Sequence, residues 1–340
     1  MSVAVQKPPS PEIVFETLNA YQRTLALRAA IELDLFSAIG QGKTTVGPLA
    51  ERIKASPKGT RVLCDYLTII GLLMKNADGS YGLTADTGLF LDRKSPAYMG
   101  SVMEFLGKIQ DDNPAYQDLT GAVRKGGTVS NAHGTMEPDN PIWVTFARSM
   151  APMMGMPAEL IAKIIASEGG AKKVLDIAAG HGLFGVAVAK YNPGARVTAV
   201  DWARVVEVAR ENATAAGVAD RHETIPGSAF DVDLGTGYDT VLLTNFLHHF
   251  DPPTCETLIR RLRAAMAPGG RVITLEFVPN PDRVSPPLHA SFAMMMLATT
   301  DAGDAYTFAE LEQMFRNAGF ARSELRELAP TPHRIVISYL

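Results

Sequence analysis

A glycine-containing turn in the second half of the sequence has the residue types of a nucleotide-binding loop. An apolar run, 173–177, leads into Gly180 and Gly182, and a helical pattern, 183–191, follows. Glycines let the backbone approach a ligand closely where the free N–H groups of a helix N-terminus point outward. Asp201 ends the next apolar run, 196–200, where its carboxylate could take two ribose hydroxyls. The sequence therefore predicts a site for a cofactor that contains a nucleoside.

Two kinds of cofactor fit this turn. The spacing Gly180-x-Gly182-x-x-Gly185 matches the dinucleotide fingerprint, so an NAD-dependent oxidoreductase is one alternative. Asp176, inside the preceding run, favours S-adenosylmethionine, because a carboxylate suits a cationic amino group and would repel a pyrophosphate. The C-terminus favours S-adenosylmethionine too. The link between the predicted strands 323–328 and 334–339 is too short for a parallel crossover, so these strands should be antiparallel, and an ordinary dinucleotide-binding fold lacks such a terminal pair. We therefore predict S-adenosylmethionine as the cofactor.

A histidine and a glutamate lie where an acceptor molecule would have to bind. His248 follows the predicted strand 238–243, at the carboxyl edge at which open α/β sheets bind ligands. Histidine, with a pKa of about 6.5, suits removal of a proton from a hydroxyl such as a phenol, whose pKa is about 10. Glu276, near the end of the predicted strand 271–277, could accept the other imidazole N–H and fix the tautomer. A lone histidine here would more often be structural, but its neighbours favour a catalytic interpretation.

The elements that must position these residues alternate between strand and helix. Strands at 173–177, 196–200, 222–225, 238–243 and 271–277 alternate with helices at 183–191, 204–216 and 254–267, which predicts a mostly parallel sheet covered on both faces. The final strand should run antiparallel to the one before it. A helix over 142–167 precedes the sheet, and Pro152 and Pro157 should kink or split it.

The N-terminal part has a different pattern. Residues 13–37 are helical, with Leu18, Tyr21, Leu25 and Ala29 on one stripe. Short helices follow over 46–53 and after the helix-opening pair Ser56-Pro57, and a hairpin is expected over 72–83. Helix, helix, helix and hairpin is the order of a winged helix.

Several segments together resemble the O-methyltransferase family that includes plant phenolic, acetylserotonin and bacterial tailoring methyltransferases. These segments are LTADTGLFL (83–91), VLDIAAGHG (174–182), VTAVDW (197–202), PGSAF (226–230), LLTNFLHHF (242–250), APGGRVITLEF (267–277) and DAYTFAELEQMFRNAGF (304–320). The resemblance covers about residues 13–340. It implies a Rossmann-like class I methyltransferase domain at 169–340, connecting helices that line the pocket at 107–168, and an all-α winged-helix dimerisation domain at 13–106 that forms a homodimer.

The resemblance also implies roles for individual residues. His248 corresponds to the general base, and the expected reaction is O-methylation of a small aromatic or polyketide-like acceptor. Asp201 corresponds to the ribose acid, Trp202 lies against the adenine, and Ser228 lies on the adenine side. The implied cofactor-binding residues are Asp176, Gly180, His181, Gly182, Asp201, Trp202, Ser228, Ala229, Phe230 and Asn245.

This sequence departs from the family pattern at three positions. His249 stands where an aspartate usually follows the base, and Ala305 stands where a second acid is expected, with Asp301 and Asp304 nearby. Ser228 replaces an acid, but its hydroxyl can still hydrogen-bond an amine. The first two departures weaken the assignment of a phenolic oxygen as the methylated atom. C- or N-methylation is therefore an alternative.

A metal is a less favoured part of that alternative. His248, His249 and His289 could supply ligands, but adjacent histidines point different ways and one carboxylate of the usual facial set is missing. We therefore expect no metal.

A flat apolar acceptor could lie among adaptable methionines and aromatic rings. The predicted pocket residues are Trp143, Phe146, Met150, Met154, His249 and Met295, and plain interdomain core is the other interpretation of the methionines.

Composition narrows the choice of partners and compartment. The net charge of −4 and pI near 6.0 argue against nucleic acid or an anionic membrane as a partner. A DNA-binding regulator is a remote alternative, because the face of the predicted helix 57–70 is too apolar to read a groove. Cys64 and Cys255 match no metal spacing, and we find neither a secretion signal nor an apolar run that could span a bilayer. We expect a cytoplasmic protein.

Overall fold

The chain folds into two compact units that meet after Met103 in the sequence. The computed structural model describes residues 9–103, 105–107, 118–130 and 140–340. The helix α10 (Ile142–Ser167), which the sequence placed in the connecting region, packs along α11 (Leu183–Tyr191) of the second unit. The three-part division of the sequence stays a prediction.

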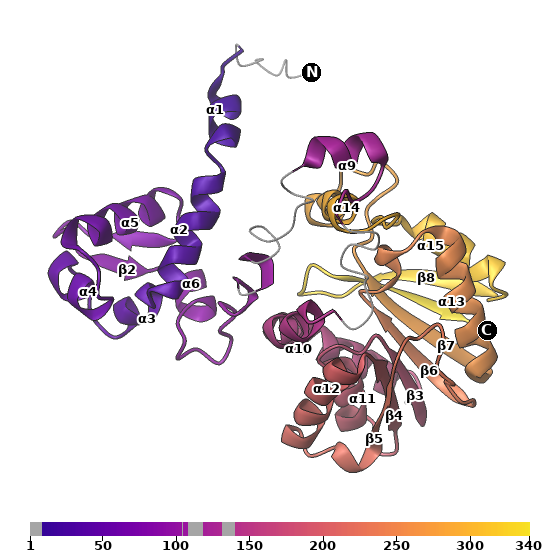
Figure 1. Cartoon of the computed structure of the whole chain (residues 1–340). Coiled ribbons are helices and arrows are strands. Elements are labelled where there is room, and N and C mark those ends of the chain that lie inside the picture. The colour runs from indigo at the N-terminus through magenta and orange to yellow at the C-terminus, as the bar shows by residue number, and fades with distance from the viewer. Residues whose placement is uncertain (1–8, 104, 108–117, 131–139) are drawn as a thin grey trace, which may run out of the picture. The chain divides into compact units, whose positions relative to one another are not determined.

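The first unit is a helical bundle with one small hairpin (Figure 1). Ser56 caps α5 by accepting a hydrogen bond from the Gly59 N–H, with Pro57 in the first turn, as the sequence indicated. The predicted hairpin is confirmed, since Leu73 pairs with Leu83 in an antiparallel register. The elements are α1 (Glu12–Leu18), α2 (Tyr21–Glu32), α3 (Leu35–Gly40), α4 (Val46–Arg52), α5 (Pro57–Ile69), β1 (Leu73–Lys75), β2 (Tyr81–Leu83) and α6 (Ala85–Phe90).

The helical stretch predicted over 13–37 is divided into three helices. It breaks at Asn19–Ala20, and again at Asp34, whose φ of 56° is left-handed and cannot continue a helix. The expected apolar stripe does not enter the core: Leu18 is 65% exposed and Tyr21 is 55% exposed. Figure 1 shows α1 extending away from the rest of this unit. This stripe is therefore available for contact outside the unit.

The second unit is built on a seven-stranded sheet in the order β5-β4-β3-β6-β7-β9-β8. Strands β3 to β7 are parallel, and β9 is antiparallel both to β7 and to β8, as the short terminal link indicated. The insertion of β9 between β7 and β8 was not predicted. The strands are β3 (Lys173–Ile177), β4 (Arg196–Asp201), β5 (His222–Pro226), β6 (Tyr238–Thr244), β7 (Met266–Glu276), β8 (Arg322–Glu327) and β9 (Arg334–Tyr339).

Helices cover both faces of this sheet, as predicted. Successive residues of β3 point to opposite faces, so that Val174 lies in the core under α10 and α11, whereas Leu175 lies in the core under α13 and α15. The helix predicted to end near 267 ends at Ala265, because the chain from Met266 onward already belongs to β7. The remaining helices are α9 (Leu119–Lys125), α12 (Ala203–Ala215), α13 (Pro252–Ala265), α14 (Pro287–Thr299) and α15 (Phe308–Asn317).

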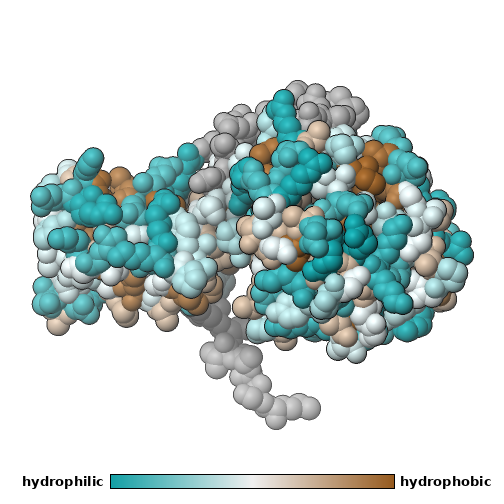
Figure 2. All heavy atoms as spheres, turned by 90° about the horizontal axis from the view of Figure 1, so that it is seen from below, coloured by the Kyte–Doolittle hydropathy of each residue, from teal (hydrophilic) through white to brown (hydrophobic). Residues whose placement is uncertain are grey.

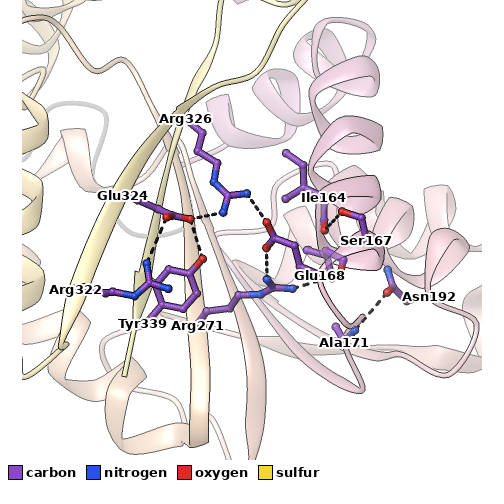
Figure 3. A network of polar contacts seen from close by, with 11 residues as sticks. Ile164, Ser167, Glu168, Ala171, Asn192, Arg271, Arg322, Glu324, Arg326 and Tyr339 are labelled. Atoms are coloured by element: carbon purple, nitrogen blue, oxygen red, sulfur yellow. Dashed lines mark hydrogen bonds and ion pairs between the residues drawn. The ribbon is translucent and has the colours of Figure 1, made fainter.

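The long helix α10 is anchored at its C-terminal end by ion pairs (Figure 3). It is one continuous helix of 26 residues, so Pro152 and Pro157 do not split it. Glu168, just after it, pairs with Arg271 Nη1 at 2.5 Å and with Arg326, which also pairs with Glu324. Because Arg271 lies on β7, this network holds the strand that ends at Glu276.

On the face shown in Figure 2, hydrophilic residues predominate and hydrophobic ones form small separate patches. None of the helices in the described ranges combines the length and apolar character that crossing a bilayer requires.

Candidate active site

The predicted cofactor loop begins with backbone that few residues other than glycine adopt. After β3, the φ angles of Ala178, Gly180 and Gly182 are +50°, +56° and +70°. A Cβ added at Gly180 would have only the Ala178 carbonyl oxygen nearby, at 3.9 Å, so the space beside this residue is open. At Gly182 it would meet the Cβ of Ala209 at 2.7 Å, so glycine is needed there for packing against α12. The loop thus combines one open position with one tightly packed position.

Asp201 fastens this loop to the end of β4. Its Oδ2 accepts a hydrogen bond from Gly180 N at 2.8 Å, and its Oδ1 accepts one from Trp202 N at 2.7 Å. Burial raises the pKa of Asp201 to about 6. A carboxylate has about four acceptor sites, so two stay available for ligand hydroxyls. Trp202, the next residue, packs in a small apolar cluster with Trp143.

Asp176 lies beneath the loop and not in the open space beside it. It is fully buried, its Oδ2 accepts a hydrogen bond from Gly185 N at 3.0 Å, and its Oδ1 has no partner among the described residues. Burial raises the pKa of Asp176 to about 8. Strand alternation turns Asp176 to the face under α11. The contact with a cationic ligand group that the sequence suggested stays a prediction.

His181 is also turned into the protein. Its Nδ1 accepts a hydrogen bond from Leu183 N at 3.1 Å, and its carbonyl oxygen accepts one from Asn212 at 2.8 Å. Burial lowers the pKa of His181 to about 4, so the ring is neutral at neutral pH. The side chain therefore satisfies one free donor in the first turn of α11.

The expected adenine-side turn lies at the same edge of the sheet. Gly227 N donates to the Asp201 carbonyl oxygen at 2.8 Å, which joins this turn to the end of β4. The Ser228 hydroxyl accepts a hydrogen bond from Phe230 N at 3.1 Å. Ala229 is buried, and Phe230 packs edge-on against Phe250 at 5.2 Å between ring centroids. This turn thus contacts both Asp201 at the end of β4 and Phe250 after the turn that follows β6.

Glu276 organises the turn that follows β6. Its Oε1 accepts hydrogen bonds from Phe246 N at 2.9 Å and from Leu247 N at 2.8 Å, and its Oε2 lies 2.5 Å from His248 Nδ1. The turn Leu247–His249 is a short 3-10 helix, and Asn245 enters it with a left-handed φ of 54°. The contact between His248 and Glu276 that the sequence suggested is therefore present, with both side chains buried.

Aromatic rings surround the two adjacent histidines. Phe292 packs edge-on against His248 at 4.8 Å between centroids and stacks on Phe277 at 3.8 Å. His249 contacts Trp143 edge-on at 5.5 Å, and Trp143 contacts Phe146 at 5.6 Å. The structure therefore joins three of the predicted pocket residues in one cluster.

The contributions of Phe277 and Phe292 to this cluster were missed. Phe277 directly follows Glu276 in the sequence, and Phe292 lies on the methionine-rich helix α14, which were the available signals.

The three predicted pocket methionines differ in burial. Met154 is buried, with its sulfur 3.8 Å from the Asn245 amide nitrogen, which ties α10 to the turn after β6. Met150 and Met295 are half-buried on α10 and α14, and their place in the pocket stays a prediction.

The other ionisable residues near the site are engaged elsewhere. Asp301 pairs with Lys125 at 3.4 Å, and Asp304 pairs with Arg283 at 3.3 Å. His289 accepts a hydrogen bond from Val278 N at 3.0 Å, and its Nε2 lies 2.7 Å from the Pro332 carbonyl oxygen. Both ring nitrogens are used, so His289 is not free to join His248 and His249 around a metal. Within the described part of the chain, no three His, Cys, Asp or Glu side chains are grouped to bind a metal ion.

Comparison with known proteins agrees with this arrangement. The O-methyltransferase domain family matches residues 116–321, and the O-methyltransferase dimerisation domain matches residues 15–93. The chain is 28% identical to 3-hydroxy-5-methyl-1-naphthoate 3-O-methyltransferase of Streptomyces sahachiroi, over 91% of this chain and 89% of that protein.

Solved structures give the same result for the fold. A candidate O-methyltransferase from Nostoc punctiforme PCC 73102 superposes with a TM-score of 0.95 at 52% identity, over 98% of this chain and 100% of that one. An O-methyltransferase from neocarzinostatin biosynthesis, solved with S-adenosylmethionine and 2-hydroxy-5-methyl naphthoic acid, has the same fold, with a TM-score of 0.72 at 21% identity over 93% and 95% of the chains. The chain belongs to the O-methyltransferase family, and it is an S-adenosylmethionine-dependent enzyme.

Proposed function

We propose that this enzyme methylates a hydroxyl group of a small aromatic or polyketide-like acceptor, with His248 as the general base. The observation that carries the proposal is the 2.5 Å contact between His248 Nδ1 and Glu276 Oε2. Glu276 is held in turn by two backbone N–H groups, so its lone pairs point in fixed directions. The imidazole therefore has one orientation and one tautomer.

The proposed tautomer sets the direction of proton transfer. If Nδ1–H donates to Glu276, Nε2 carries the free lone pair, and no described residue offers Nε2 a hydrogen bond. An acceptor hydroxyl can then give its proton to Nε2. The positive charge that forms on the ring is stabilised by the buried Glu276 carboxylate, as in other histidine–carboxylate pairs.

The residues at the glycine loop fit S-adenosylmethionine. The open position at Gly180 allows close approach, and the Asp201 carboxylate has acceptor sites for the two ribose hydroxyls. Trp202, Ser228, Ala229 and Phe230 would contact the adenine, and Asn245 would lie at the methionyl end. When bound, the cofactor supplies a methyl group on a sulfonium, which is a good leaving group. Asp176 and His181 would act indirectly, by holding the start of α11.

The lining of the pocket supports a flat acceptor. Trp143, Phe146, Phe292 and His249 present ring faces and edges, and Met150, Met154 and Met295 would fill the remaining gaps. Burial and the neighbouring His248 lower the pKa of His249 well below its usual value, so this ring is neutral where the family usually has an aspartate. The relative from Streptomyces sahachiroi is named for a hydroxynaphthoate substrate, which is an acceptor of this shape.

Replacement of the base tests the proposal. For His248→Ala we expect kcat with a phenolic acceptor to fall by ~10²–10⁴-fold, the usual contribution of general acid–base catalysis. The affinity for S-adenosylhomocysteine, measured by calorimetry, should not change. A hydroxynaphthoate panel with labelled cofactor, read by mass spectrometry, provides the acceptor. Unchanged turnover in the variant, or methyl transfer to carbon or nitrogen only, would contradict the proposal.

We further propose a homodimer in which the exposed apolar stripe of the first unit meets its copy. Ile13, Phe15, Leu18 and Tyr21 are each more than half exposed, and the last three lie within the match to the dimerisation domain, residues 15–93. The order of α3, α4, α5 and the β1–β2 hairpin is that of a winged helix. Phe15→Asp should shift the mass measured by light scattering to that of a monomer.

We also propose a cytoplasmic location, since Cys64 and Cys255 are buried free thiols.

A further inference from the structure

Three backbone segments lie against one another beside His248. The first is the catalytic turn, Leu247–His249. The second, which we name the strap, is residues 300–303 between α14 and α15, and the third is residues 126–128 after α9. At both places where these segments meet, the closest residue is a glycine.

Gly303 brings the strap onto the catalytic turn. A Cβ at this position would lie 2.2 Å from the His248 carbonyl oxygen and 3.0 Å from the His249 carbonyl carbon. Real Cβ atoms essentially never approach another atom within 3.0 Å, and although the Thr300 hydroxyl oxygen, also close at 2.6 Å, belongs to a side chain, the His248 carbonyl oxygen is backbone and cannot swing aside. Any larger residue must therefore displace either the backbone of His248 or the segment that carries residue 303.

Gly127 brings the third segment onto the strap in the same way. Its Cβ would lie 2.2 Å from the Asp301 carbonyl oxygen. Next to it, Thr128 N donates to the Thr300 carbonyl oxygen at 2.8 Å. The three segments are thus stacked in the order 126–128, strap, catalytic turn, with backbone in contact at each step.

The strap is also held along its length. Gly303 N donates to the Thr300 hydroxyl at 2.9 Å, and that hydroxyl donates to the Met296 carbonyl oxygen at 2.7 Å. Just beyond the strap, the Tyr306 hydroxyl donates to the Phe250 carbonyl oxygen at 2.5 Å. The strap cannot easily retreat from the catalytic turn, because it is fastened on both sides of Gly303.

We infer that Gly303 and, through it, Gly127 are positioning residues that set the place of the His248 imidazole for the methyl-transfer reaction. The inference rests on the proposed function, in which His248 is the base. Glu276 fixes the imidazole by its Nδ1, and the strap fixes the backbone from which that imidazole extends. Neither glycine touches the acceptor or the cofactor in this role.

The experiment compares Gly303→Ala and Gly127→Ala with Gly194→Ala, a control at an exposed glycine with no atom within 4 Å of its added Cβ. We expect kcat with a phenol to fall by about 100-fold in Gly303→Ala, because a 1 Å displacement of a catalytic group can cost that much. We expect a loss of about tenfold in Gly127→Ala, because it acts through one more segment. S-adenosylhomocysteine affinity should stay unchanged in all three variants.

A second acceptor separates positioning from loss of structure. An acidic nitrophenol, already ionised at the assay pH, needs no base, so Gly303→Ala should methylate it at close to the wild-type rate. Thr300→Val, which removes the hydroxyl that holds Gly303 N without adding bulk at His248, provides the same comparison if Gly303→Ala does not fold.

Equal losses with both acceptors, or wild-type kcat in the folded variant, would overturn the inference. His248→Ala separates the base role of His248 from the positioning role of Gly303. If His248→Ala loses turnover while Gly303→Ala does not, only the positioning role fails. If both retain turnover, the proposed base fails as well.

Discussion

The cofactor loop and the catalytic turn lie at the same edge of one sheet, and each depends on an acidic side chain, but the two acids differ in what surrounds them. Asp201 accepts two backbone hydrogen bonds, from Gly180 and Trp202, and burial raises its pKa to about 6. Glu276 accepts two short backbone hydrogen bonds and also contacts the His248 imidazole. Each Asp201 oxygen accepts one backbone hydrogen bond, whereas Glu276 Oε1 accepts those of Phe246, Leu247 and, at 3.4 Å, His248, and its Oε2 contacts the imidazole.

This difference indicates that Asp201 serves cofactor binding and that Glu276 serves to orient His248. A carboxylate with spare acceptor sites suits a ligand that must enter and leave, and Asp176 beneath it is held by a single N–H donor. A carboxylate such as Glu276, which accepts several backbone hydrogen bonds on one oxygen and contacts an imidazole with the other, suits a group that must not move during the reaction. We therefore expect changes on the loop to alter cofactor affinity and changes at the turn to alter turnover.

The largest expected effect is at Glu276. For Glu276→Ala we expect kcat to fall by roughly 10³-fold or more, because the histidine loses the partner that fixes its tautomer. The free energy of unfolding should also fall by about 3 kcal/mol, because buried donors lose their acceptor. Turnover assays and urea denaturation measure the two effects.

The matched variant is Glu276→Gln, which keeps an oxygen for the backbone N–H groups. It should retain most of the stability and still lose turnover. Full turnover in Glu276→Gln would show that the charge of this residue does not matter to the reaction.

The next effect concerns pH and Asp176, the buried acid of β3 beneath the cofactor loop. Burial raises its pKa to about 8 in the folded chain, from an ordinary value of 3.8. Between about pH 4 and pH 8 the folded state therefore holds a proton that the unfolded state releases, so the free energy of unfolding should fall as the pH rises. One proton contributes at most ~1.4 kcal/mol per pH unit.

Asp176→Asn isolates this contribution. The wild type should become less stable relative to the variant when cofactor-free protein is denatured with urea at pH 5, 6, 7 and 8. A constant difference across these pH values would mean that Asp176 titrates normally.

A third expected effect is at Asp201. Asp201→Ala should weaken S-adenosylhomocysteine binding by roughly 10–100-fold, the range for hydrogen bonds to a charged group. At saturating cofactor, kcat should stay near the wild-type value, because the base is untouched. Calorimetry and saturation kinetics measure the two quantities, and a large loss of kcat with unchanged affinity would abolish the distinction between loop and turn.

The smallest expected effect is at Ser228. Its hydroxyl already accepts the Phe230 N–H, so it offers a ligand little more than a weak additional hydrogen bond. Ser228→Ala should weaken cofactor binding by only about threefold, within the usual worth of one neutral hydrogen bond. Calorimetry should show a smaller loss of S-adenosylhomocysteine affinity in Ser228→Ala than in Asp201→Ala. A larger loss of affinity in Ser228→Ala would contradict this prediction.

Much of the fold could be predicted because its signals are local. The alternation of strands and helices, the Ser56-Pro57 helix start and the antiparallel end of the chain follow from neighbouring residues. The partnership of His248 and Glu276 could be predicted as well, because parallel strands end at one edge of a sheet. The helical position of Leu18 and Tyr21 could also be predicted. Their exposure could not, because it depends on whether other segments of the first unit pack over them.

The sequence by itself predicted the cofactor class, the order of the elements and a histidine as the proposed base, since short motifs and local periodicity carry these signals. Only the tertiary structure decided that Asp176 lies beneath α11, that both His289 nitrogens are occupied and that Gly303 touches the His248 carbonyl. Burial, hydrogen-bond partners and close backbone approach depend on segments far apart in the chain. Their distances are set by packing and not by spacing in the sequence.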